Sequence, residues 1–259
     1  MDASKVFTKD YYDTVSDLTS LETTLKQVDF LKKALHLKRG ARILDIPCGN
    51  GRHSIQLAKA GFRVTGSDSS SPLLKIAKEE AEAMGVYLEL KKGDMRRVKI
   101  GKRFDAVINM FTSFGYFDDE GTELFLQNIK RHLKPGGKFL IDCENPARLM
   151  RSVFEKGKYN KKKNVFIHKI LRRPRPGEIR KLERNFDPIR MNWDVKVYWS
   201  SVDDKETIQR YKFRLYRLPE LRSILKSNGM RIRNVWGDFD GSPLNNKSAR
   251  MIVLAENLE

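Results

Sequence analysis

Hydrophobic and polar residues alternate in two distinct rhythms along the first 150 residues. Residues 1–40 favour helix, because leucines and valines recur every three or four positions between residues 18 and 35. Beyond Gly40, short apolar runs expected to form strands alternate with amphipathic segments expected to form helices. The expected strands cover residues 42–46, 62–67, 86–90, 104–109 and 138–143, and the expected helices cover 52–60, 71–85 and 119–133.

The pattern changes after residue 150. Four expected strands, at 163–173, 178–187, 193–201 and 206–213, follow one another with turn signals between them and no helix. A last helix, 218–229, precedes two strands, 231–236 and 250–255, that are placed to pair as a hairpin. Together these segments predict an α/β fold. Its main domain, residues 1–150 and 214–259, is a doubly wound, mostly parallel seven-stranded sheet, and residues 151–213 form a small antiparallel β insertion.

Charge distinguishes the insertion from the rest of the chain. The net charge of the 259 residues is +18, and residues 151–233 hold 24 basic against 9 acidic side chains. This segment therefore accounts for +15 of the total. Such asymmetry indicates either an anionic partner or a lysine-rich solvated surface, and composition alone leaves both readings open.

Composition sets further limits on the class of protein. No apolar run approaches the roughly 18 residues that a membrane span needs, and no apolar signal core follows the first residues. The two cysteines, Cys48 and Cys143, and the four histidines show no metal-ligand spacing. The expectation is a cytoplasmic protein that binds neither a membrane nor a metal ion.

The residues that point to a ligand gather where the first two strands end. Asp45 closes the first strand and is followed by a turn with Gly49 and Gly51, at the start of a helix. Asp68 closes the second strand, where a carboxylate meets ribose hydroxyls in nucleoside-binding folds. A nicotinamide dinucleotide site is disfavoured, because Ser54 stands where its fingerprint requires a third glycine.

These residues resemble motif I of the class I (Rossmann-like) S-adenosylmethionine-dependent methyltransferases, which is an acidic residue followed by G-x-G. The segments 93–95, 104–109 and 133–137 are similar to further motifs of that family, in the expected order. The resemblance implies S-adenosyl-L-methionine as cofactor, with Asp68 on its ribose and Asp94 and Met95 at its adenine. The implied cofactor-binding residues are Tyr12, Asp45, Pro47, Cys48, Gly49, Gly51, Asp68, Ser69, Asp94, Met95 and Asn109.

The chain is most similar to small stand-alone members of this family that carry a β-rich insertion after the fifth strand, some of which methylate amines of small molecules. Within that resemblance Tyr12 is expected to close over the cofactor, and the insertion to act as a substrate lid. The residues expected to line the substrate site are Ser113, Phe114, Tyr116, Arg214 and Tyr216. The expected reaction is in-line methyl transfer to a nitrogen or oxygen of a small molecule, with an anionic substrate suited to the basic insertion.

Other functions stay open at this point. An RNA methyltransferase would use the basic insertion, including the lysines 161–163, to follow phosphates. Methylation at a pyrimidine carbon would need a thiolate, for which Cys143 is the candidate, although its neighbours do not match such enzymes. A non-catalytic, cofactor-binding regulatory protein is the alternative from another class. The sequence names neither the methyl acceptor, nor a general base, nor the oligomeric state.

Overall fold

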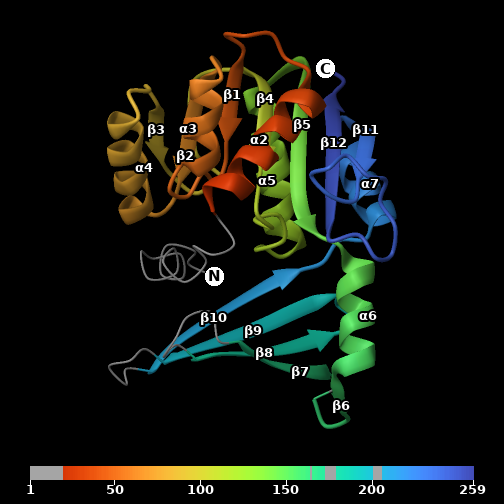
Figure 1. Ribbon diagram of the computed structural model, residues 1–259. Coiled ribbons are helices and arrows are strands. Elements are labelled where there is room, and N and C mark those ends of the chain that lie inside the picture. Colours follow the sequence, from red (N-terminus) through yellow and green to blue (C-terminus); the bar gives the residue numbers. More distant parts are fainter. Residues whose placement is uncertain (1–19, 164, 173–178, 201–205) are drawn as a thin grey trace.

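The larger of two sheets forms the body of the protein (Figure 1). The computed structural model describes residues 20–163, 165–172, 179–200 and 206–259, and Tyr12 and the rest of residues 1–19 lie outside that description. Within the described residues the sheet has seven strands, in the order β11-β12-β5-β4-β1-β2-β3. They are β1 (Arg42–Asp45), β2 (Arg63–Asp68), β3 (Glu89–Lys92), β4 (Phe104–Asn109), β5 (Leu133–Glu144), β11 (Met230–Trp236) and β12 (Arg250–Asn257).

Strand direction in this sheet follows the sequence expectation. β1 to β5 pair in parallel, while β12 runs antiparallel to both β5 and β11, so the last two strands do form the expected hairpin. The carboxyl ends of the parallel strands therefore meet along one edge. Because strand order reverses between β1 and β4, this edge is where an open α/β sheet binds its ligands.

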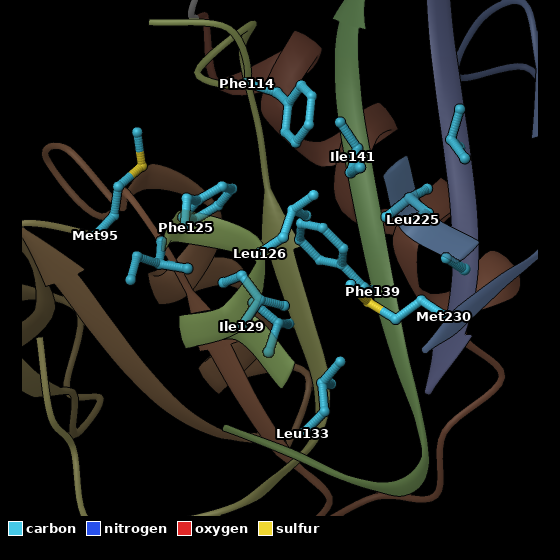
Figure 2. Packing of buried hydrophobic residues seen from close by; sticks show 14 of the residues in the cluster. Met95, Phe114, Phe125, Leu126, Ile129, Leu133, Phe139, Ile141, Leu225 and Met230 are labelled. Atoms are coloured by element: carbon cyan, nitrogen blue, oxygen red, sulfur yellow. The ribbon is translucent and has the colours of Figure 1, made fainter. Parts of the chain in front are cut away.

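Helices cover both faces of the sheet and bury two separate cores. On one face α5 (Asp119–His132) and α7 (Leu218–Ser227) pack on side chains such as Phe139 and Ile141, and Figure 2 shows α5 and β5 meeting there. On the other face α2 (Leu21–Leu35) and α3 (Arg52–Lys59) pack on residues that include Ile43 and Ile108. α4 (Ser71–Ala83) packs beside α3, on β2 and β3. Successive side chains along each strand point to opposite faces of the sheet, so one strand contributes residues to both cores.

The second sheet is smaller and antiparallel. Its strands, in the order β10-β9-β8-β7-β6, are β6 (Lys158–Asn160), β7 (Val165–Arg172), β8 (Ile179–Asp187), β9 (Asn192–Ser200) and β10 (Glu206–Arg214). Leu182, Phe186, Trp193 and Val195 share one face and pack with Val153 of α6 (Pro146–Lys156) in a third core. Figure 1 shows this sheet opposite the edge where β1 and β4 end, so the two sheets flank the candidate site.

Three elements differ from the sequence expectation. β3 begins at Glu89 rather than residue 86, because Val86 donates its N–H to the Ala81 carbonyl and so completes the end of α4. Residues 134–137 bulge from β5: Phe104 pairs with Leu133, and Ala106 already pairs with Lys138.

The third difference is α6, which was not expected. Its start has the residues that commonly begin a helix: the Asn145 side chain accepts a hydrogen bond from the Ala147 N–H, and Pro146 occupies the first turn. α6 crosses residue 151, where the expected insertion begins.

Candidate active site

The loop between β1 and α3 is shaped by two glycines. Gly49 and Gly51 have φ values of +57° and +77°, which L side chains rarely adopt. A Cβ on Gly51 would lie 2.9 Å from the Ala77 Cβ, so α4 also requires glycine there. The Cys48 N–H donates to the Ser67 carbonyl at 2.9 Å and ties the loop to the end of β2. The turn thus brings backbone N–H groups and the N-terminus of α3 to the ligand-binding edge of the sheet.

Asp68 holds this loop from the second strand. Its Oδ2 accepts the Gly49 N–H at 2.8 Å and its Oδ1 accepts the Ser70 N–H at 2.9 Å. Burial raises the pKa of Asp68, and the backbone N–H donors of Ser70, Gly49 and Ser69 oppose that rise. Each carboxylate oxygen keeps a lone pair beyond these bonds, which suits a pair of hydroxyl donors.

Asp45 lies beneath the loop, with only 1% of its surface exposed. Its Oδ2 accepts the Ser54 hydroxyl at 2.6 Å, but among the described residues its Oδ1 has no hydrogen-bond partner. Burial raises the pKa of Asp45 to about 7, although the Ser54 hydrogen bond and the charge of Arg52 act to lower it. A buried carboxylate with one unpaired oxygen is costly in isolation and fits a ligand with a positive charge.

Two further buried polar atoms without a described partner lie at neighbouring strand ends: Ser67 Oγ on β2 and Asn109 Oδ1 on β4. The Asn109 amide is oriented by its Nδ2, which donates to the Ile46 carbonyl at 2.7 Å. Pro47 follows Ile46 through a cis peptide bond and, like Ser69, is partly exposed. These unpaired oxygens are the observation that fits a polar ligand such as S-adenosylmethionine at this edge.

The expected adenine-side residues lie after β3. Asp94 forms a two-pronged ion pair with Arg96, whose guanidinium lies 4.2 Å from the centre of the Phe117 ring. Met95 is 9% exposed and joins the core between α5 and the sheet. Cys48 is buried as well, and burial raises the pKa of its thiol, so it is a neutral side chain within the loop. The roles of these residues remain predictions.

The expected substrate-lining residues lie together, but most of their side chains have partners inside the protein. Phe114 and Tyr216 are 3% and 4% exposed, and their ring centres are 5.1 Å apart. The Tyr216 hydroxyl is hydrogen-bonded to Thr122 at 2.9 Å, and Ser113 donates to the Met110 carbonyl. These four side chains therefore build the underside of the loop after β4, while Tyr116 is partly exposed.

Arg214 joins the loop after β4 to the small sheet. Its guanidinium is paired with Asp119 and Glu220 and lies 4.6 Å from the centre of the Tyr216 ring. Its backbone N–H donates to the Gly115 carbonyl at 2.8 Å. Gly115 has a φ of +107°, and a Cβ there would overlap the Arg214 carbonyl, so only glycine permits this approach. Two carboxylates neutralise its charge, so the Arg214 guanidinium ties the end of the small sheet to α5 and α7 and is not free to bind an anion.

Sequence reasoning missed four residues at this edge. Phe111 and Thr112 both have left-handed backbones, with φ of +59° and +62°, which costs about 1–3 kcal/mol per residue outside glycine. They are held by Asp142 of β5 and Arg250 of β12. One signal was available: Asp142 directly follows the apolar residues 139–141 within an expected strand, and a charge in such a position needs a partner.

A thiolate nucleophile finds little support in this arrangement. Cys143 is buried, its Sγ lies 3.3 Å from the Met251 carbonyl, and burial raises its pKa to about 12, so it is not poised as a thiolate. Among the described residues, acidic, histidine and cysteine side chains do not group into a metal site. Within the same residues, no helix is both long and apolar enough to span a membrane.

Comparison with known proteins finds relatives over the part of the chain that holds this site. Residues 43–137 match the family model described as a methyltransferase domain. The cypemycin N-terminal methyltransferase of a Streptomyces species is 35% identical over 114 residues, which is 44% of this chain and 46% of that protein. The dTDP-3-amino-3,6-dideoxy-alpha-D-glucopyranose N,N-dimethyltransferase of Streptomyces fradiae is 30% identical over 135 residues, or 52% and 47% of the two chains. The chain thus spans about half the length of these curated relatives.

A solved structure extends the likeness to the whole fold. An S-adenosylmethionine-dependent methyltransferase from Clostridium acetobutylicum superposes with a TM-score of 0.79 at 18% identity, covering 96% of each chain. Residues 43–137 are therefore similar to a methyltransferase domain, and the chain as a whole has the Rossmann-like fold of that structure, with a small antiparallel sheet beside the main one. That solved protein is named as a methyltransferase that depends on S-adenosylmethionine.

Proposed function

We propose that the protein transfers a methyl group from S-adenosylmethionine to a nitrogen or oxygen atom of a small molecule. The observation that carries the proposal is the meeting of Asp45, Asp68 and the loop of Gly49 and Gly51 at one sheet edge, inside the matched domain. Asp68 binds the ribose hydroxyls, Asp45 faces the positively charged end of the cofactor, and Asp94 with Met95 holds the adenine.

The cofactor supplies a sulfonium-bound methyl group that is open to in-line displacement. The protein's own residues bind the two reactants, orient them and exclude water from the site. These effects by themselves account for much of such catalysis. Asn109, held by the Ile46 carbonyl, and the loop after β4 bound the place where the acceptor approaches. A neutral amine needs no general base, because it can attack first and lose its proton afterwards.

A nitrogen acceptor is favoured over oxygen. The two curated relatives are named for methylation at an N-terminus and at the amino group of a nucleotide-linked sugar. Among the described residues at this edge, the buried Asp142 is paired with Arg250 and the buried His53 is hydrogen-bonded to Gln27, so neither is placed as a base. An alcohol needs such a base because of its high pKa, whereas an amine does not.

The small antiparallel sheet acts as the substrate lid, with the insertion spanning residues 151–213 between two parts of the main domain, 1–150 and 214–259. Its position opposite the carboxyl ends of β1 and β4 supports this role (Figure 1). The Gly115–Arg214 hydrogen bond connects the lid directly to the loop that borders the acceptor. An anionic small molecule would meet a basic lid.

One observation favours RNA as a second candidate substrate. The lysines at positions 156, 158 and 161–163 are all exposed, around an aromatic group in which Phe154 and Tyr159 are 52% and 49% exposed. Exposed rings and lysines together suit single-stranded nucleic acid. The patch lies at the far end of α6 and β6 from the main sheet, and therefore away from the methyl-transfer edge (Figure 1).

The test is radiolabelled methyl transfer from S-adenosylmethionine into fractionated cell extract. Label in small molecules that is lost with Asp68→Ala supports the proposal. Label in RNA that is lost when the lysines 161–163 are changed to glutamine supports the second candidate instead. Absence of labelling by a protein that still binds S-adenosylhomocysteine would favour a non-catalytic, cofactor-binding role.

A further inference from the structure

A buried ion pair lies directly behind the loop that follows β4. Asp142 is 1% exposed, and Arg250 Nε donates to its Oδ1 at 2.7 Å. Burial acts to lower the pKa of Arg250, but the charges of Asp142 and Glu144 outweigh it and raise that pKa overall. Both residues lie on neighbouring antiparallel strands of the main sheet, so the pair has a rigid base. A buried pair of this kind stabilises a fold only weakly, which leaves its presence to be explained.

The hydrogen bonds of the pair converge on two residues. Asp142 Oδ2 accepts the Phe111 N–H at 2.9 Å, and the Asp142 carbonyl accepts the Thr112 N–H at 3.0 Å. Arg250 Nη2 donates to Thr112 Oγ1 at 2.8 Å. Among the residues that the structure describes, Phe111 and Thr112 are the consecutive pair with left-handed backbones, and Thr112 is β-branched, which makes that backbone especially unfavourable. Without these bonds the loop would relax to a more ordinary conformation.

The same loop connects the other parts of the site. Its left-handed pair begins two residues after Asn109, whose strand pairs with β1 near Asp45. The Phe111 ring lies 5.4 Å from the guanidinium of Arg52, the residue that follows Gly51 in the glycine loop. A few residues on, Gly115 contacts Arg214 and the lid. The strained backbone therefore stands between the cofactor loop and the proposed substrate lid.

We propose that Asp142 and Arg250 are positioning residues for methyl transfer, which hold the Phe111–Thr112 backbone where the acceptor meets the methyl group. The inference rests on the proposed function of this edge. Asp142 and Arg250 act through the loop rather than on the acceptor itself. A displacement of the loop would move the acceptor out of line, and misplacement by about 1 Å can cost on the order of 100-fold in rate.

The test begins with Asp142→Asn. An asparagine amide of the same shape cannot accept from both the Phe111 N–H and Arg250, because one of its two terminal atoms is itself a donor. Hydrogen–deuterium exchange should become at least about tenfold faster at the amides of Phe111 and Thr112, and stay unchanged at Cys48 in the cofactor loop. S-adenosylhomocysteine affinity should stay within about threefold, while kcat for the labelled acceptor falls by about 100-fold.

Glycine rescue separates positioning from general stability. Thr112→Gly added to Asp142→Asn removes the steric penalty of the left-handed backbone, so it should restore kcat by about tenfold or more. The matched control is Glu256→Gln, which breaks the ion pair with Arg233 elsewhere on β12 and should change neither exchange at the loop nor kcat. If Asp142→Asn does not fold, Thr112→Val removes the bond to Arg250 alone and should lower kcat by about three- to tenfold.

Two results would overturn the inference. Unchanged exchange at Phe111 and Thr112 would mean that the pair does not hold the loop. Faster exchange with unchanged kcat would mean that the loop's conformation does not matter for transfer. A wild-type protein that binds no S-adenosylhomocysteine and transfers no methyl group would instead refute the proposed function. The exchange measurement would still show whether Asp142 and Arg250 hold the loop.

Discussion

Cofactor affinity should rise with pH through the titration of Asp45. Burial raises the pKa of this carboxyl to about 7, so in the ligand-free protein it is mostly protonated below that pH. A bound ligand with a positive charge near Asp45 Oδ1 favours the carboxylate and returns the pKa toward its ordinary range. Binding then requires loss of a proton at low pH, and it weakens as pH falls.

The size of the effect follows from linkage. If binding returns the Asp45 pKa to near its ordinary value, the dissociation constant should be about fifteenfold lower at about pH 7 than at about pH 5.5, or roughly 1.6 kcal/mol. The ligand's own amino group titrates near pH 8 and stays mostly protonated across this range. The stability of the ligand-free protein should change in the opposite direction: a raised carboxyl pKa favours the folded state at low pH, and this contribution is lost as pH rises toward 7.

Isothermal titration of S-adenosylhomocysteine at a series of pH values measures this directly, with Asp45→Asn as the matched variant. The asparagine mimics the protonated acid, so its affinity should resemble that of the wild type at low pH and should vary little with pH. Burial also raises the pKa of Asp68, so any pH dependence of affinity that remains in the variant is assigned to Asp68. Equal pH dependence in the wild type and the variant would refute the placement of the ligand's charge at Asp45.

Three shorter predictions test other parts of the site. Asp68→Ala should weaken S-adenosylhomocysteine binding by about 2–3 kcal/mol in the same titration, because charged hydrogen bonds to the ribose and to Gly49 are lost; unchanged affinity would contradict the ribose assignment. Gly51→Ala should lower the unfolding free energy by about 1–3 kcal/mol in a denaturant melt, since its Cβ would crowd Ala77. Cys143→Ala should keep at least about half of the methyl-transfer rate, because the neutral thiol is not a nucleophile.

The main sheet was predictable because its signals are local. The parallel strands other than β3 contain short apolar runs, and helix starts carry recognisable residues, such as Pro72 in the first turn of α4. The errors arose where tertiary contacts override local patterns. The hydrogen bond from Val86 back to the end of α4 delays β3, and the bulge before Lys138 depends on pairing with β4, which no local pattern records.

The two halves of the site differ in the same way. The proposed cofactor half is carried by one contiguous loop and by Asp68 at the next strand end, so the order of residues along the chain already implies their proximity. The residues that shape the proposed acceptor half, Asp142, Arg250 and Thr112, come from segments about 30 to 140 residues apart. Their association appears only when β12 lies beside β5.

A consequence for specificity follows from this division. The loop after β4 is bound on one side by Asp142 and Arg250 in the main sheet, and on the other by the backbone contact between Gly115 and Arg214 at the end of the small sheet. A change in the lid can therefore reach the acceptor position through Gly115 without altering Asp45 or Asp68. Lids of different shape, joined to the same main sheet at this point, would then direct the same methyl-transfer chemistry to different acceptors.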